Sequence, residues 1–263
     1  MTFITFLTDF GLQDDFVGTC HGVIARIAPE ARVIDLTHGI PPQAVLQGAL
    51  VLANTTPYLP VGVHLAVVDP GVGSTRRAVA VRTDDGRTFV GPDNGLLMLA
   101  ADAIGVASAH ELADPRYRLA EVSNTFHGRD VFAPAAAHIA SGVAIEELGP
   151  AIAPADLVRV AVPDPEVGRT QVSASVLAVD RFGNVATNAR REHVDALGVD
   201  KVEIRLALDR YYALVGATFA DADPGELVLY RDSYGLMTLA IRNGDAAGLT
   251  GLRAGDEVRI AVA

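Results

Sequence analysis

The apolar residues of this sequence change their spacing once, near a short segment rich in proline and charge. Before this segment, short apolar runs alternate with longer amphipathic stretches, which is typical of strands and helices in an α/β sheet with mostly parallel strands. Beyond it, short alternating runs are separated by glycine and aspartate turns, which favours an antiparallel barrel. We therefore predict an N-terminal α/β domain (residues 1–162) with a central, mostly parallel sheet, a linker (163–170) and a smaller C-terminal antiparallel β-barrel-like domain (171–263).

Composition limits the partners of such a chain. Half of the 263 residues are hydrophobic, so each domain is able to bury a core, and the net charge of −11 disfavours binding to nucleic acid or to anionic membranes. The single cysteine, Cys20, excludes an intrachain disulfide and indicates a cytoplasmic protein. The first residues lack the basic flank and cleavage site of a signal peptide, and no apolar run is long enough to span a bilayer.

Acidic side chains directly follow two of the predicted strands. Asp9 follows the first strand, and Asp69 follows the apolar run 65–68. Ligands of α/β proteins bind at the carboxyl ends of strands, so both carboxylates are candidate site residues. Asp69 is also followed by a loop with two glycines and then by Arg76 and Arg77, which places an acid, a flexible loop and a base in one strand–loop–strand unit.

The remaining elements are predicted from periodicity and turn residues. Amphipathic or alanine-rich stretches predict helices over residues 17–27, 43–54, 96–104 and 134–141. Asp84, Asp85 and Gly86 predict a hairpin between strands 78–82 and 88–91.

His127 is a further candidate for chemistry, to be considered together with Asp69 and Arg76. It lies in a polar loop and is followed by Arg129 and Asp130, a setting that tunes an imidazole for proton transfer. A structural role is equally open from these residues alone, because a histidine often packs its own loop and an Asp–Arg pair often only ties strand ends together.

A second polar cluster combines Asp180, Asn184 and Asn188 around a glycine. Carboxylates and amides suit ribose hydroxyls or a free amino acid, although a capped β-turn explains the same residues. Metal binding by Asp9, Asp69, His64 and His127 is a weaker alternative, because no metal-ligand motif is present, and we expect no metal site. The phosphate-binding and dinucleotide-binding glycine motifs and the Gly-x-Ser-x-Gly motif are also missing from the sequence.

Five motifs together resemble those of one family, and they follow its order along nearly the whole chain. They are Leu7–Gly11, Val68–Ser74 with Arg76, Gly91–Gly95, Phe126–Asp130 and Asp180–Asn184. The family is that of the S-adenosyl-L-methionine hydrolases, or hydroxide adenosyltransferases, which are relatives of the bacterial fluorinase and chlorinase.

The resemblance implies that water attacks C5′ of the adenosyl group and displaces methionine, with no cofactor. The family's catalytic triad falls on Asp69, Arg76 and His127, and it selects Arg76 rather than Arg77 as the partner of Asp69. We expect His127 to accept the proton of water while Arg76 and Asp69 hold the water in a hydroxide-like state.

The same resemblance assigns substrate-binding roles. Asp9 is expected to hold the ribose hydroxyls, and Asp180 and Asn184 the methionine ammonium. Ser233, Arg242 and Asn243 are expected near the carboxylate and adenine. Proteins of the family are trimers whose sites lie between the N-terminal domain of one subunit and the C-terminal domain of its neighbour.

Three other functions are compatible with these residues: a halogenase, a protein that binds the substrate without turnover, and a metal-dependent hydrolase. Fluorinase-like members carry an extra loop where this chain passes directly through Asp84, Asp85 and Gly86. Halogenases also lack the complete Asp-Arg-His set, so water is the predicted nucleophile.

Overall fold

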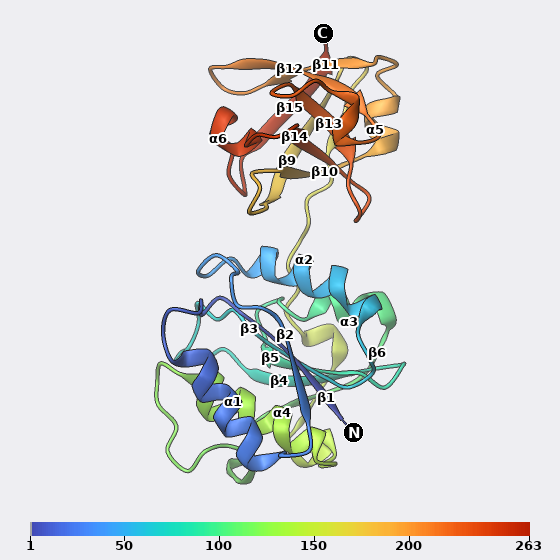
Figure 1. Ribbon diagram of the computed structural model, residues 1–263. Coiled ribbons are helices and arrows are strands. Elements are labelled where there is room, and N and C mark those ends of the chain that lie inside the picture. The colour runs from blue at the N-terminus through green and yellow to red at the C-terminus, as the bar shows by residue number, and fades with distance from the viewer. Residues whose placement is uncertain (1) are drawn as a thin grey trace. The chain divides into compact units, whose positions relative to one another are not determined.

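The computed structural model describes residues 2–263, which form two compact units, the first ending at Val160 and the second beginning at Ala161 (Figure 1). The first unit contains a seven-stranded sheet and the second an eight-stranded one. The predicted α/β class and the barrel-like second domain are confirmed.

Strands and helices alternate through most of the first unit. Its strands are β1 (Phe3–Thr8), β2 (Arg32–Thr37), β3 (Val63–Val67), β4 (Ala78–Thr83), β5 (Thr88–Pro92), β6 (Val106–Glu111) and β7 (Ala151–Ile152). Its main helices are α1 (Phe16–Ile27), α2 (Val45–Thr55), α3 (Met98–Ile104) and α4 (Ala133–Ala140), the last preceded by a π-helical turn, η3 (Gly128–Phe132).

The strand order of this sheet is β2-β1-β3-β5-β4-β6-β7. β1 pairs in parallel with β2 on one side and with β3 on the other, and β3 pairs in parallel with β5. The predicted hairpin is confirmed, since β4 runs antiparallel to β5, and β6 and β7 continue the antiparallel edge.

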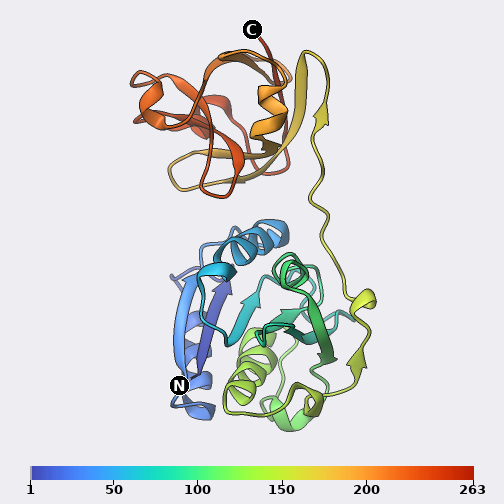
Figure 2. The ribbon, with the colours of Figure 1, turned by 90° about the vertical axis from the view of Figure 1, so that its right-hand side faces the viewer.

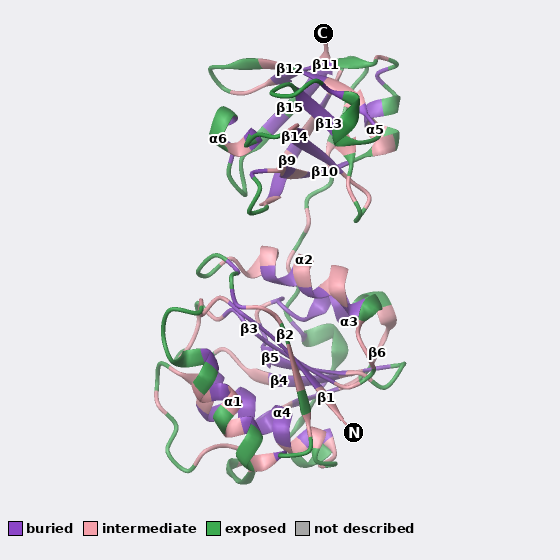
Figure 3. Cartoon of the chain, in the orientation of Figure 1, coloured by how far each residue is buried: buried purple, intermediate pink, exposed green. Residues whose placement is uncertain are grey.

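Two apolar cores cover the two faces of the sheet, because successive side chains of a strand point to opposite sides. Phe6 and Leu65 belong to the core that also contains residues of α1 and α4, whereas Leu7 and Ala66 belong to the core formed with α2 and α3. Figure 1 shows these helix pairs on opposite sides of the sheet, and Figure 3 shows the central strands buried between them.

The order of the strands creates a switch point between β1 and β3. The chain leaves β1 through α1 to reach β2 on one side, and it returns through α2 to β3 on the other side. In open α/β sheets, ligands bind outside the carboxyl ends of the strands at such a point. Asp9 and Asp69 follow these two strands.

The second unit is a closed barrel whose curved strands are visible in Figure 2. Its strands are β8 (Glu166–Val167), β9 (Gln171–Val179), β10 (Val185–Arg190), β11 (Lys201–Arg205), β12 (Arg210–Gly216), β13 (Leu227–Arg231), β14 (Leu236–Ile241) and β15 (Glu257–Val262). Two short helices, α5 (Arg191–Asp195) and α6 (Ala246–Thr250), complete the unit.

The barrel closes because the long strand β9 has different neighbours along its length. Its first half pairs with β15 and with the short strand β8, and its second half pairs with β10. The strand β8 lies within residues 163–170, which were expected to form a linker. β12 and β13 are parallel rather than antiparallel, because the connection 217–226 returns the chain to the end of the barrel where β12 began.

Among residues 2–263, no helix combines the length and the apolar character that crossing a membrane requires.

The burial of Leu52 in the core beneath α2 allows the effect of a substitution on the free energy of unfolding to be predicted. Leu52 is 0% exposed there, so Leu52→Ala leaves a cavity and should lower the free energy of unfolding by about 2–5 kcal/mol. Leu12, which is 75% exposed, provides the control, and Leu12→Ala should change that free energy by less than about 0.5 kcal/mol. Urea denaturation followed by circular dichroism measures both, and equal losses would contradict the proposed core.

Candidate active site

Asp9 and Asp69 lie at the same edge of the sheet. Thr8 at the end of β1 pairs with Val67 at the end of β3, so the two carboxylates extend from the carboxyl ends of neighbouring parallel strands. This placement agrees with the predicted position of a ligand site at the switch point.

Asp69 and Arg76 form a bidentate ion pair. Arg76 Nε donates to Asp69 Oδ1 at 3.1 Å, and Arg76 Nη2 donates to Asp69 Oδ2. The two side chains are only 8% and 6% exposed, and the guanidinium carbon lies 5.2 Å from the centre of the Phe132 ring. The planar guanidinium is therefore fixed on one edge by the carboxylate and on one face by an aromatic ring.

Arg76 also joins the pair to His127. Its Nη2 lies 3.2 Å from His127 Nδ1. Because a guanidinium only donates hydrogen bonds, Nδ1 is the acceptor, and the neutral ring carries its proton on Nε2. The structure thus brings the three predicted residues into one network, with Arg76 at its centre.

Burial and charge keep His127 neutral. Burial is the main cause that lowers its pKa, and the positive charge of Arg76 lowers it further, while Asp69 and Asp130 act in the opposite direction. The uncharged ring is the form whose Nδ1 accepts from Arg76.

The loop that carries His127 is held by Asp130. This carboxylate is fully buried and accepts hydrogen bonds from the backbone and the hydroxyl of Ser123, both at 2.8 Å, and from Arg129 Nε at 2.5 Å. These hydrogen bonds outweigh the opposing effect of burial and lower the pKa of Asp130. His127 itself caps the π-helical turn η3, a type of turn that is frequent at functional sites.

Gly73 allows the two loops of the network to touch. Its φ angle is +77°, and a Cβ atom there would lie 2.4 Å from the carbonyl oxygen of Asn124, in the loop that carries His127. Any other residue would push the loops apart. By contrast, a Cβ atom on Gly71 would have its nearest neighbour, Ser74 Oγ, at 3.4 Å.

Arg77 has a different partner from Arg76. Its Nε and Nη2 donate to Asp93 Oδ2 at 2.9 and 2.6 Å, and Nη2 also donates to the carbonyl of Asp156 at 2.5 Å. The contact between Asp69 and Arg76, rather than Arg77, is the one that the family resemblance implied.

Asp9 has one constrained oxygen and makes no hydrogen bond to the network within residues 2–263. Its Oδ2 accepts the backbone N–H of Gln43 at 2.8 Å, and Gln43 has the left-handed φ angle of +66°. The carboxylate is thereby oriented at the sheet edge while Oδ1 retains its accepting capacity.

The second polar cluster lies in the barrel unit. Asp180 Oδ1 accepts the backbone N–H groups of Phe182 and Asn184, at 2.8 and 2.9 Å, and its Oδ2 accepts Asn184 Nδ2 at 2.7 Å. This is the capped turn that the sequence left open as an alternative. The same turn also lines a cavity of about 840 Å³.

Four of the six predicted substrate-binding residues line this cavity: Asp180, Asn184, Arg242 and Asn243. Ser233 does not line it, since it is exposed in the turn between β13 and β14. Asn188 has a structural role, because its side chain accepts from Ser175 N–H and donates to the carbonyl of Pro163.

Sequence reasoning missed the aromatic wall of this cavity, which consists of Phe182, Phe219 and Tyr230. The rings of Phe219 and Tyr230 lie 4.6 Å apart, and burial, assisted by Asp232 and Asp180, raises the pKa of Tyr230 to about 12. The available signal in the sequence was Phe182, which belongs to the Asp180–Asn184 motif. Its side chain is exposed in the structure. Amides beside aromatic rings suit a planar heterocycle with polar edges.

The four residues considered as metal ligands from the sequence do not form a ligand cluster within the described part of the chain. His64 is buried in β3, where its Nδ1 lies 2.9 Å from Thr5 Oγ1, and burial lowers its pKa to about 4. Within residues 2–263, the side chains that converge as a potential metal-binding group are instead His21, Asp35 and His38.

Comparisons with known proteins cover both units. Family models described as the SAM hydroxide adenosyltransferase N-terminal and C-terminal domains match residues 4–149 and 174–259. The (R)-S-adenosyl-L-methionine hydrolase of Salinispora tropica is 48% identical over 98% of this chain and 97% of its own length, and a fluorinase of Nocardia brasiliensis is 29% identical over 98% and 96%. The crystal structure of a conserved protein from Thermotoga maritima aligns with a TM-score of 0.89 and 38% identity over 98% of this chain and 100% of the other. The chain therefore belongs to the SAM hydroxide adenosyltransferase family.

Proposed function

We propose that this protein hydrolyses S-adenosyl-L-methionine to adenosine and L-methionine. The observation that carries the proposal is the partly buried Asp69–Arg76–His127 network at the switch point of the sheet. Its chemistry matches the activity named for the Salinispora relative.

The reaction needs an oriented water more than it needs an acid. Water oxygen forms a bond to C5′ as the bond from C5′ to sulfur breaks, and the electron pair passes to sulfur. The sulfonium becomes a neutral thioether, and one proton is released to solvent. Because the sulfonium already is a good leaving group, we propose that no cofactor takes part and that positioning supplies the acceleration.

Arg76 and His127 are well placed to hold that water. Arg76 donates hydrogen bonds from Nε and Nη2 to Asp69 and from Nη2 to His127. Its Nη1 has no hydrogen-bond partner among residues 2–263. Nη1 of Arg76 and Nε2–H of His127 would stabilise negative charge as it develops on the attacking oxygen. We propose this donor role for His127 in place of the proton-accepting role expected from the sequence, and Asp69 then serves to fix Arg76.

The remaining site residues are proposed to bind the substrate. Asp9 would accept from the ribose hydroxyls, and the Asp180–Asn184 turn would bind the methionine ammonium. Arg242, Asn243 and Ser233 would lie nearer the carboxylate and the adenine.

We also propose a homotrimer in the cytoplasm, without nucleic-acid or membrane partners, in which residues of neighbouring subunits complete each site. The support for this assembly is the family resemblance, together with the division of the proposed residues between the two units. The single free cysteine supports the compartment.

Product analysis tests the proposed reaction. Incubation with S-adenosyl-L-methionine should give adenosine and methionine in equal amounts, with chloride or fluoride present as well as without. Arg76→Gln should lower turnover by about 10²–10³-fold, because it removes the central donor. Arg77→Gln, which alters the neighbouring arginine paired with Asp93, should retain most of the turnover. Preferential formation of 5′-halo-5′-deoxyadenosine, or tight binding without methionine release, would refute the proposal.

The pKa of His127 tests the link to Arg76. In the wild type it should lie below the ordinary value of 6.5, and it should rise in Arg76→Gln because a nearby positive charge is lost. The value of kcat/KM should accordingly fall as the pH drops through this pKa, since a protonated Nδ1 no longer accepts from Arg76. NMR titration measures the pKa, with His138, whose pKa is lowered by burial alone, as an internal control. An unchanged His127 pKa in Arg76→Gln would contradict the contact.

Alanine substitutions at the two glycines of the Asp69 loop test whether the close approach at Gly73 matters for catalysis. Gly73→Ala should lower kcat by roughly 100-fold, because the added Cβ displaces the loops that hold Arg76 and His127. Gly71→Ala adds the same methyl group where space exists and should have a small effect. Steady-state kinetics, with circular dichroism to verify folding, compares them, and equal activities would show that the loop contact is unimportant.

A further inference from the structure

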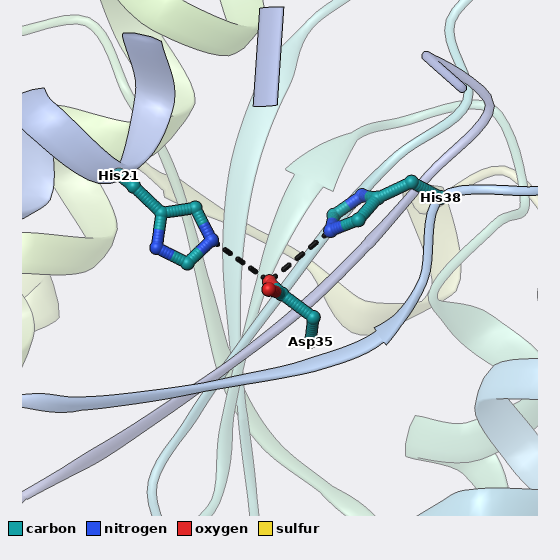
Figure 4. A group of neighbouring side chains, drawn as sticks. All are labelled: His21, Asp35 and His38. Atoms are coloured by element: carbon teal, nitrogen blue, oxygen red, sulfur yellow. Dashed lines mark hydrogen bonds and ion pairs between the residues drawn. The ribbon is translucent and has the colours of Figure 1, made fainter. Parts of the chain in front are cut away.

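A second cluster of ionisable side chains makes no hydrogen bond to Asp69, Arg76 or His127 within the described residues and is unused by the proposed reaction. His21 of α1, Asp35 of β2 and His38 just after β2 converge, with one ligand atom of each residue lying within 4.8 Å of the others (Figure 4). We propose that these three residues bind a divalent transition-metal ion of the zinc class.

The fold itself brings the three side chains together. Asp35 pairs with Phe6 in the parallel register of β2 and β1, so both side chains point to the face of the sheet that α1 covers. The ring of Phe6 then packs against both imidazoles, with ring centres 5.9 Å from His21 and 4.8 Å from His38. This buried ring fixes the two histidines around the carboxylate.

The distances suit a shared cation. His21 Nε2 lies 2.9 Å and His38 Nε2 3.1 Å from the same oxygen, Asp35 Oδ1 (Figure 4). Donors held at zinc-ligand distance from one ion in tetrahedral geometry are roughly 3.3 Å apart. Small side-chain movements would therefore admit the ion.

His38 supplies a second indication that the cluster can accept an ion. The residue is only 4% exposed, and its Nε2 has no partner within the described chain other than the Asp35 carboxylate, to which it makes a close contact but no well-aligned hydrogen bond. Its Nδ1 lies 2.8 Å from Thr8 Oγ1. When Nδ1–H donates to that hydroxyl, Nε2 presents a lone pair toward the carboxylate, and a cation between them satisfies both acceptors. A hydrogen bond of this kind also orients metal-binding histidines in known sites.

The donor set selects the kind of metal. Two imidazole nitrogens and one carboxylate oxygen suit zinc and other divalent transition ions, whereas magnesium and calcium prefer oxygen ligands throughout. Water would fill the remaining coordination positions. The bound ion would join α1 to the end of β2, where the His38 carbonyl accepts Gly11 N–H at 2.8 Å, so we assign it a structural role distinct from the proposed hydrolytic step.

Metal titration of the full chain tests the proposal. Protein freed of metal with a chelator should bind one zinc ion per chain in competition with a chromophoric chelator. His21→Ala and Asp35→Asn, which alter partly exposed side chains, should each raise the Kd by more than about 100-fold, and Thr8→Val by about 10–100-fold through loss of the orienting hydroxyl.

The control is His138→Gln, which removes an imidazole of the same unit that packs against Tyr117 and is outside the cluster. Its zinc affinity should equal that of the wild type. Binding of less than one zinc ion per chain, or an unchanged Kd in His21→Ala and Asp35→Asn, would overturn the site and leave a hydrogen-bonded His–Asp–His group. The readout is metal affinity, so it is independent of whether the protein hydrolyses S-adenosyl-L-methionine.

Discussion

The bidentate pair between Asp69 and Arg76 is the interaction on which the first unit's site depends. Both side chains are nearly buried, and removal of one partner from such a pair leaves an uncompensated charge at a cost of about 3–5 kcal/mol. The pair is retained at the end of β3 because it fixes a planar cation that binds His127 as well. Asp69 thus acts through Arg76, and Arg76 orients the imidazole and selects the tautomer whose Nδ1 accepts a hydrogen bond.

The rest of the first unit supplies the setting for this pair. The reversal of strand order between β1 and β3 leaves the carboxyl ends of two buried strands uncovered, and Asp9 and Asp69 occupy them. The close approach at Gly73 and the buried carboxylate of Asp130 then bring the His127 loop to the arginine. Two loops that are far apart in sequence therefore meet at Gly73, where a larger residue would collide with the carbonyl oxygen of Asn124.

Local signals allowed most of the fold to be predicted, whereas the family resemblance was needed to select Arg76 rather than Arg77 as the partner of Asp69. Strand and helix periodicity and turn residues located most elements, but β10 was not predicted because the polar residues Thr187 and Asn188 interrupt its apolar alternation. His127 is 51 positions from Arg76, so only the family resemblance joined them. The tautomer of His127 and the His21–Asp35–His38 cluster follow from side-chain contacts and strand register across the chain, which composition and spacing do not encode.

We propose that Arg76 holds His127 as a hydrogen-bond donor to the attacking water. Nitrogen-15 NMR of the histidine side chains at neutral pH, with His127→Gln used to assign the signal, observes this state directly. We expect His127 to carry its proton on Nε2, with an unprotonated Nδ1 that accepts from Arg76. A proton on Nδ1 instead would contradict it, because Nε2 would then be the free acceptor and His127 would be suited to remove a proton from water.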